Sequence, residues 1–213
     1  MSLKLDLHVH SRYSADSLIT TKDLVFYARK RGLDGVAITD HDRLNGALRI
    51  AKETDLFIIP GAEVTSSRGH IIGLNVQNEI PNRLSVEETV DRIHEAGGLA
   101  VACHPVGLFK GGLGNNITSE FDAVEVVNSS AFPFGYSVRR SQELALSVGI
   151  ESLIAGSDAH YGPEIGRAYT AVDAEMGIDE VVKAIREGLC KPFGQAIPLT
   201  LRLEKILLTA LKK

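Results

Sequence analysis

Short runs of apolar residues alternate along this chain with longer segments in which apolar residues recur every three or four positions. The short runs are typical of buried strands, and the longer segments are typical of helices that bury one face. We expect strands over residues 4–9, 35–39, 56–60, 70–76, 99–103, 123–127 and 153–157. We expect helices over residues 22–31, 45–54, from the Ser85/Glu88 capping pattern to the glycines at 97–98, and over 137–148, 179–188 and 199–211.

The alternation of strands and helices favours an α/β fold with a parallel sheet. About seven such strands can close into a barrel, and an open, doubly wound sheet is the alternative. We favour the barrel because residues with metal-binding side chains follow the ends of most strands, and in a barrel these ends converge on one mouth. No shift in composition marks a linker, so residues 1–197 are expected to form a single domain. The amphipathic segment 198–213 is expected to form a helix packed on the barrel or at a subunit interface.

Composition narrows the classes of function. The 213 residues carry a formal net charge of −4, which argues against a surface that coats nucleic acid. No apolar run approaches the roughly 20 residues that span a bilayer, and the first residues do not form the apolar stretch of a signal peptide. Two cysteines, Cys103 and Cys190, fit a reducing compartment better than a disulfide framework. We therefore expect a cytoplasmic protein with neither a membrane nor a stable nucleic-acid partner.

Six of the seven histidines lie in short motifs near predicted strands, together with three acidic residues. Imidazole and carboxylate groups are ligands of Zn²⁺, Mn²⁺ and iron ions. The nine candidate ligands are His8, His10, Asp16, His41, Glu63, His70, His104, Asp158 and His160. A core cannot bury so many polar groups without partners, because each unpaired group is costly to remove from water. The apolar flanks of the motifs argue against a surface position, so the sequence predicts a metal site.

Two of these motifs place ligands two residues apart. Side chains at positions i and i+2 of a strand point to the same face, so His8 and His10 are expected to face one way, as are Asp158 and His160. The same alternation is expected to turn the thiol of Cys103 away from the ligand that follows it. A single pair of this kind is more often structural, but two pairs on separate strands favour metal binding.

Other polar residues are candidates for supporting roles. Asp6, Asp40 and Asp42 flank ligand histidines and are candidates to orient them. Glu125 and Asn128 lie at the end of a predicted strand and are candidates to reach the mouth of the barrel.

Two arginines are candidates for phosphate contacts, because a guanidinium group can bind phosphate through two hydrogen bonds. Arg12 follows the first motif, and Arg167 follows the last. Lys110 lies in the glycine-rich stretch GLFKGGLGNN, which is a candidate for a loop over the site. This stretch does not have the GK[ST] ending of a P-loop.

The ordered motifs DLHVHSRYSAD, ITDHD, PGAEV, GHIIG, ACHP and GSDAH resemble the PHP family, named for polymerase and histidinol phosphatase. The resemblance runs from Asp6 to about Thr170 and implies a distorted seven-stranded βα barrel with two or three divalent ions. By motif, His8, His10, Glu63 and Asp158 would hold one ion, Asp16, His41 and His160 a second, and Glu63, His70 and His104 a third.

The resemblance also implies hydrolysis of phosphoesters. A hydroxide that bridges the metal ions would attack phosphorus in line, so that neither a serine nor a cysteine nucleophile would be required. The expected substrate is a small phosphomonoester, a nucleotide or a short oligonucleotide. The C-terminal helix would also allow a homodimer.

Two other classes of function stay open. A metal-dependent amidohydrolase also carries an H-x-H motif on the first strand of a barrel, but usually with a bridging lysine that no central strand offers here. A non-catalytic regulatory module would keep the metal ions for stability alone. The complete set of ligands disfavours this second class.

Overall fold

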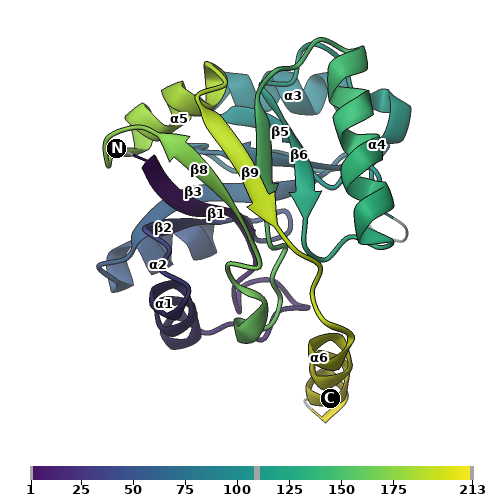
Figure 1. Cartoon of the computed structure of the whole chain (residues 1–213). Coiled ribbons are helices and arrows are strands. Elements are labelled where there is room, and N and C mark those ends of the chain that lie inside the picture. The colour runs from purple at the N-terminus through teal and green to yellow at the C-terminus, as the bar shows by residue number, and fades with distance from the viewer. Residues whose placement is uncertain (1, 108–110, 212–213) are drawn as a thin grey trace.

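The computed structural model describes residues 2–107 and 111–211. Nine strands in this part of the chain form one sheet, in the order β7-β6-β5-β4-β3-β2-β1-β8-β9 (Figure 1). The strands are β1 (Ser2–Val9), β2 (Gly35–Ile38), β3 (Phe57–Thr65), β4 (His70–Leu74), β5 (Leu99–Ala102), β6 (Ala123–Asn128), β7 (Leu153–Gly156), β8 (Ala168–Asp173) and β9 (Cys190–Gly194). The predicted α/β class is confirmed, whereas the count of seven strands is not.

The sheet is a nearly closed barrel because the chain beyond β7 returns to the end of β1. Val9 and Ala159 form a parallel bridge there. The His10 amide donates to the carbonyl of Ala159 at 3.0 Å, and the Asp158 amide donates to the carbonyl of His8 at 2.8 Å. We call this contact between β1 and residues 158–159 the seam. The other half of the same edge of β1 is taken by β8, which runs antiparallel to it.

Strand β4 runs antiparallel to both of its neighbours, β3 and β5. The expectation of a fully parallel sheet is therefore wrong at this strand. Only residues 66–69 separate β3 from β4, and a crossover to a parallel neighbour takes about a dozen residues or more. Because of the reversal, His70 at the start of β4 pairs with Thr65 at the carboxyl end of β3. His70 thus lies at the same end of the barrel as ligands that follow parallel strands.

Aliphatic side chains fill the barrel interior on the side away from these ligands. This inner group is buried and includes Leu3, Leu5, Ala37, Ile59, Ile72, Leu99, Val101 and Ile154. Helix α5 (Ile178–Arg186) adds Val181 and Ile185 to the same group. It lies near the start of β1 in Figure 1, so it closes the barrel at the end opposite the site.

Four helices cover the outer face of the sheet, namely α1 (Thr21–Lys30), α2 (Asn45–Glu53), α3 (Val86–Glu95) and α4 (Phe134–Ser147). Each buries an apolar stripe against the strands, as Leu24 does in α1 and Ile93 in α3. The predicted capping residue Ser85 accepts a hydrogen bond from the Glu88 amide at 3.1 Å. Two short 3₁₀ helices lie in connections, η1 (Gly114–Asn116) and η2 (Gly162–Glu164).

The last helix, α6 (Leu199–Leu211), follows β9 and stands apart from the helices that cover the sheet (Figure 1). Leu203, Ile206 and Leu207 are each more than 60% exposed (62%, 61% and 65%). In residues 2–107 and 111–211, no helix combines the length and the apolar character that crossing a membrane requires. The boundary at residue 198 and the packing role of α6 stay predictions.

Candidate metal centre

The carboxylate of Glu63 lies at the centre of the candidate site, projecting from β3 into the barrel with 1% exposure. Its Oε2 lies 3.0 Å from Nε2 of both His8 and His10. Its Oε1 lies 2.6 Å from Nδ1 of His70 and 2.8 Å from Nε2 of His104. One carboxylate thus contacts imidazoles from β1, from β4 and from the segment after β5. The structure brings all nine candidate ligands together around it.

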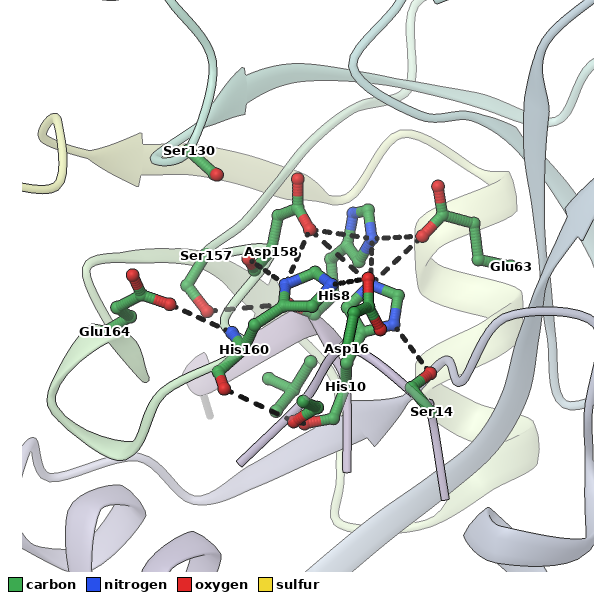
Figure 2. A network of polar contacts seen from close by, with 12 residues as sticks. His8, His10, Ser14, Asp16, Glu63, Ser130, Ser157, Asp158, His160 and Glu164 are labelled. Atoms are coloured by element: carbon green, nitrogen blue, oxygen red, sulfur yellow. Dashed lines mark hydrogen bonds and ion pairs between the residues drawn. The ribbon is translucent and has the colours of Figure 1, made fainter. Parts of the chain in front are cut away.

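A bulge in β1 directs two of these ligands into the barrel. The leucines at positions 3, 5 and 7 belong to the inner group, so strict alternation would point His8 outward. The pairing of β1 with β2 shifts register between Asp6 and Val9, and beyond the shift both His8 and His10 face Glu63. Bulges often redirect side chains next to active sites in this way. As expected, the two imidazoles lie on one side, with their Nε2 atoms 3.1 Å apart (Figure 2).

Asp158 and His160 reach the site from the chain just beyond β7 (Figure 2). Strand alternation does not place them, because β7 ends at Gly156. Asp158 instead has a φ of 54°, in the left-handed region, and its backbone is held in the seam. Its Oδ1 lies 3.5 Å from Nδ1 of His160 and 3.6 Å from Nε2 of His8. The two pairs of ligands predicted from the sequence therefore meet across the seam.

Asp16 and His41 form the solvent-facing side of the cluster. Asp16 Oδ2 lies 3.1 Å from Nε2 of His160 and 3.5 Å from Nε2 of His41. Their side chains are 55% and 30% exposed, in contrast to Glu63. Ser14, which the sequence did not single out, lies behind them and accepts a hydrogen bond from the His41 amide at 2.9 Å. The cluster is therefore accessible from the side of Asp16 and His41.

His104 turns toward Glu63 because its backbone departs from strand geometry. Strand β5 ends at Ala102, and His104 has a φ of 30°. Cys103 continues the inward-facing alternation of the strand, and its Sγ lies 3.8 Å from Oε1 of Glu63. The expectation that the Cys103 thiol points away from the site is therefore wrong. Alternation turns the thiol inward, and the irregular residue is its neighbour.

Glu125 is the carboxylate that orients a ligand histidine. Its Oε1 lies 3.0 Å from Nδ1 of His8, and its Oε2 accepts hydrogen bonds from the His104 amide at 2.8 Å and from Asn128 Nδ2 at 2.9 Å. A carboxylate on the second ring nitrogen fixes the orientation of a metal-binding imidazole. A sequence signal for this role existed, because Glu125 is the single charged residue in the apolar strand AVEVVN.

The three aspartates expected to orient ligands hold backbone and hydroxyl groups instead. Asp6 accepts from the amides of Ser157 and Gly166, Asp40 from the amide and hydroxyl of Ser11, and Asp42 from the amide and hydroxyl of Thr65. Burial raises the pKa of Asp6 to about 6. These aspartates support the loops that carry the ligands rather than the ligand imidazoles themselves.

Burial and the mixture of acids and imidazoles shift pKa values at the centre of the site. Burial opposes the charged form of Glu63, but the charge of His8 and hydrogen bonds from other imidazoles outweigh it, so the pKa of Glu63 lies well below its usual value. Burial also opposes the charged form of His8, yet the carboxylates of Glu125, Asp158 and Glu63 raise its pKa well above 6.5. These pKa shifts therefore favour opposite charges on the neighbouring Glu63 and His8.

The distances between ligand atoms fit divalent ions bound among them. Two ligands about 2.1 Å from a tetrahedral ion lie about 3.4 Å apart. The contacts of His8 and His10 with Glu63 and Asp158 span 3.0 to 3.6 Å. These four residues form one group whose ligand atoms lie within 4.8 Å of one another, and it equals the set expected for the first ion. Three further groups are His10, His41 and His160; His41, Glu63 and His70; and Glu63, Cys103 and His104. The first of these groups shares two residues with the set expected for the second ion. The other two groups each share two residues with the set expected for the third ion.

A cavity of about 450 Å³ opens at the cluster and is lined by Gly111 and seven of the candidate ligands. Arg12 and Arg167 are not among the residues that line it. The Arg12 guanidinium lies over the ring of Tyr13, while burial and the nearby charge of Arg31 lower the pKa of Arg167. Their predicted phosphate contacts therefore gain no support from their positions. Lys110, from the glycine-rich stretch, lies outside the described residues.

Metal binding is expected to strengthen as the pH rises above 6.5. Burial opposes the charged form of these imidazoles, but Asp16 raises the pKa of His41 and Glu63 raises the pKa of His70. The pKa of His8 is likewise raised by its neighbouring carboxylates. An imidazole binds a metal ion in its neutral form, so protons on these rings must leave when an ion binds. We expect at least about tenfold tighter Mn²⁺ binding at about pH 8 than at about pH 6.5, measured by competition with a chelator calibrated at each pH. Equal affinities would contradict this.

Comparison with known proteins agrees with this geometry. The chain matches the family model for the PHP domain over residues 6–193. It is 37% identical over 141 residues to an uncharacterized protein of Methanocaldococcus jannaschii, covering 60% of this chain and 82% of that protein.

Solved structures share the fold at low identity. One is a two-domain protein from Bacteroides vulgatus containing a predicted PHP-like metal-dependent phosphoesterase, with a TM-score of 0.73, 19% identity, and coverage of 92% of this chain and 65% of that chain. Another is a lesion-specific endonuclease from Pyrococcus furiosus, with a TM-score of 0.66, 19% identity, and coverage of 90% and 58%. At these identities the similarity establishes the fold alone.

Proposed function

We propose that this chain, which belongs to the PHP domain family, hydrolyses phosphate esters with divalent metal ions held around Glu63. The position of Glu63 carries the proposal. One of its oxygens lies against His8 and His10, and the other lies against His70 and His104. A carboxylate between two sets of imidazoles is suited to bridge cations, and clustered cations are suited to the charge of a phosphoryl group.

The residues of the cluster have distinct roles in this proposal. The proposed ligand sets are His8, His10, Glu63 and Asp158 for one ion, Asp16, His41 and His160 for a second, and Glu63, His70 and His104 for a third. When bound, Zn²⁺, Mn²⁺ or iron ions would lower the pKa of a water molecule and neutralise charge on the phosphate. Glu125 is a positioning residue that holds the ring of His8, and Asn128 supports Glu125. The exposed side of the cluster admits the phosphate, while Glu63 stays shielded from bulk water.

The proposed substrate is a small phosphomonoester, a nucleotide or a short oligonucleotide. The cavity of about 450 Å³ at the cluster falls within the range of small-molecule sites, which runs from about 300 to about 1,000 Å³. Its lining by metal-ligand side chains suits the phosphate itself rather than a large apolar group.

Removal of metal ions is expected to abolish hydrolysis. The protein is assayed with p-nitrophenyl phosphate in the presence of Mn²⁺, Zn²⁺ or Fe²⁺, then dialysed against EDTA and assayed again. We expect the rate to fall by at least about 100-fold and to return when metal is restored, since the ions supply both the activated water and the charge. Metal content is measured by mass spectrometry on the same samples.

The same experiment separates the other classes of function. Hydrolysis of p-nitroacetanilide in place of the phosphoester would favour an amidohydrolase. Bound metal with no turnover of either compound would favour a regulatory module. Unchanged phosphoester hydrolysis after complete removal of metal would contradict the proposal.

A further inference from the structure

A second cavity adjoins the candidate metal centre and is not explained by it. It measures about 570 Å³ and lies between the barrel and α6. The barrel side chains Asp16, Ser130 and His160 form one wall, and Ile206, Thr209 and Ala210 of α6 form the other. Figure 2 draws Asp16 and His160 within the cluster and Ser130 beside it. Since Asp16 and His160 also line the cavity at the cluster, the two spaces share a boundary.

Polar contacts hold α6 in place across this cavity. The Arg202 guanidinium donates to the carbonyls of Ser130 at 3.1 Å and Ser129 at 3.3 Å. Lys205 Nζ lies 2.9 Å from Oε1 of Glu164. These contacts join the helix to the loops after β6 and β7. Ile206 and Ala210 supply the apolar part of the cavity wall, and both stay partly open to solvent.

One of these contacts reaches the backbone of a candidate ligand. Glu164 is fully buried, and its Oε2 accepts a hydrogen bond from the His160 amide at 2.9 Å. The same carboxylate pairs with Lys205 of α6. The helix is therefore attached to the segment that carries His160, and the second cavity is built into the site.

We propose that this cavity holds the organic group of the substrate while its phosphate lies at the metal centre, an assignment that rests on the proposed function. Its volume of about 570 Å³ suits a small organic group. Lys205, the cation among its lining residues, is paired with Glu164, so it offers no free partner for a second phosphate. None of the lining residues is Phe, Tyr or Trp, so stacking on a nucleobase is not provided. The geometry points to a monophosphate ester with a compact, uncharged organic group.

A pair of non-hydrolysable phosphonates tests the cavity without turnover. Phenylphosphonate carries a ring that would enter the cavity, and methylphosphonate does not. With the Mn²⁺-loaded chain of 213 residues in a calorimeter, we expect phenylphosphonate to bind about tenfold more tightly, because its ring gains contact with Ile206 and Ala210. Thr209→Trp fills the cavity and should remove this preference, while methylphosphonate binding changes less than about twofold.

Leu207→Trp is the matched control, because it adds the same indole to α6 at a residue that is 65% exposed and outside the cavity lining. It should leave both affinities unchanged. Ile206→Asp is a second variant, which places a charge in the cavity without bulk and should also weaken phenylphosphonate selectively. An equal effect on both phosphonates, no effect, or binding of neither phosphonate by the unmodified protein would overturn the assignment. A normal phosphonate preference without phosphoester hydrolysis would overturn the proposed function instead.

Discussion

Replacing Glu63 with glutamine is expected to abolish hydrolysis and to release at least one metal ion from the site. The carboxylate contacts imidazoles through both oxygens, at 2.6 to 3.0 Å. An amide of the same shape keeps one oxygen but turns an uncharged NH₂ group toward the other set of ligands. Loss of a supporting residue around a metal ion costs about 10- to 100-fold in affinity or activity, and loss of a bridging ligand should cost more. We expect kcat to fall by at least about 1,000-fold.

Metal content and kcat are measured on the same preparations, for the Glu63→Gln protein and for a control variant. Glu87→Gln is the control, because this substitution makes the same chemical change at an exposed residue in the first turn of α3. The control should keep the metal content and rate of the unmodified protein. A Glu63→Gln protein with full metal content and an unchanged rate would remove the basis of the proposed function.

Replacing Gly156 with alanine is expected to destabilise the fold and to disrupt the metal centre together. Gly156 ends β7 inside the barrel, against His8 and Glu125. A Cβ at this position would overlap the Cβ of His8 and lie 2.7 Å from Oε1 of Glu125 and 2.9 Å from the His8 amide nitrogen. Two of these groups are backbone or close to it and cannot rotate away. Overpacking of this kind costs about 3 kcal/mol at its upper range, and we expect a loss of that size.

Gly135→Ala is the matched control for this prediction. Gly135 lies in the first turn of α4, and a Cβ there would meet nothing within 4 Å. Alanine is favoured over glycine in a helix, so this variant should be unchanged or more stable by about 0.5 kcal/mol. Stability is measured by chemical denaturation, and Mn²⁺ affinity by competition with a chelator. Near-equal stability of the two variants would mean that the close approach of β7 to β1 tolerates a side chain.

The predictable part of the fold is the part built from short, continuous apolar runs. The runs at β2, β5 and β7 are buried along their whole length or nearly so, and their predicted positions agree with the structure to within a residue or two. Strands β8 and β9 were not predicted. β8 alternates between buried and half-buried residues, and β9 contains Pro192 and is largely exposed. An edge strand of this kind lacks the apolar run by which a buried strand is recognised.

The candidate site was predictable as a set of residues and less so in its geometry. Spacing by two residues placed His8 and His10 on one side correctly, although a bulge rather than regular alternation turns them inward. The direction of β4 could have been inferred from its short connection to β3. The left-handed backbone of His104 and Asp158 could not, because only a small minority of histidines and aspartates adopt this conformation, although both types are enriched in it.

The seam has a consequence for how the protein matures. It joins residues that are far apart in the chain, since the His8 carbonyl accepts a hydrogen bond from the Asp158 amide. Next to the seam, the Asp6 carboxylate accepts a hydrogen bond from the Gly166 amide across 160 positions. His8, His10 and Asp16 precede the other candidate ligands in this sequence, and Asp158 and His160 follow them all. A nascent chain therefore has no complete set of candidate ligands until Asp158 and His160 have been added. The ligand group His8, His10, Glu63 and Asp158 therefore depends on closure of the seam.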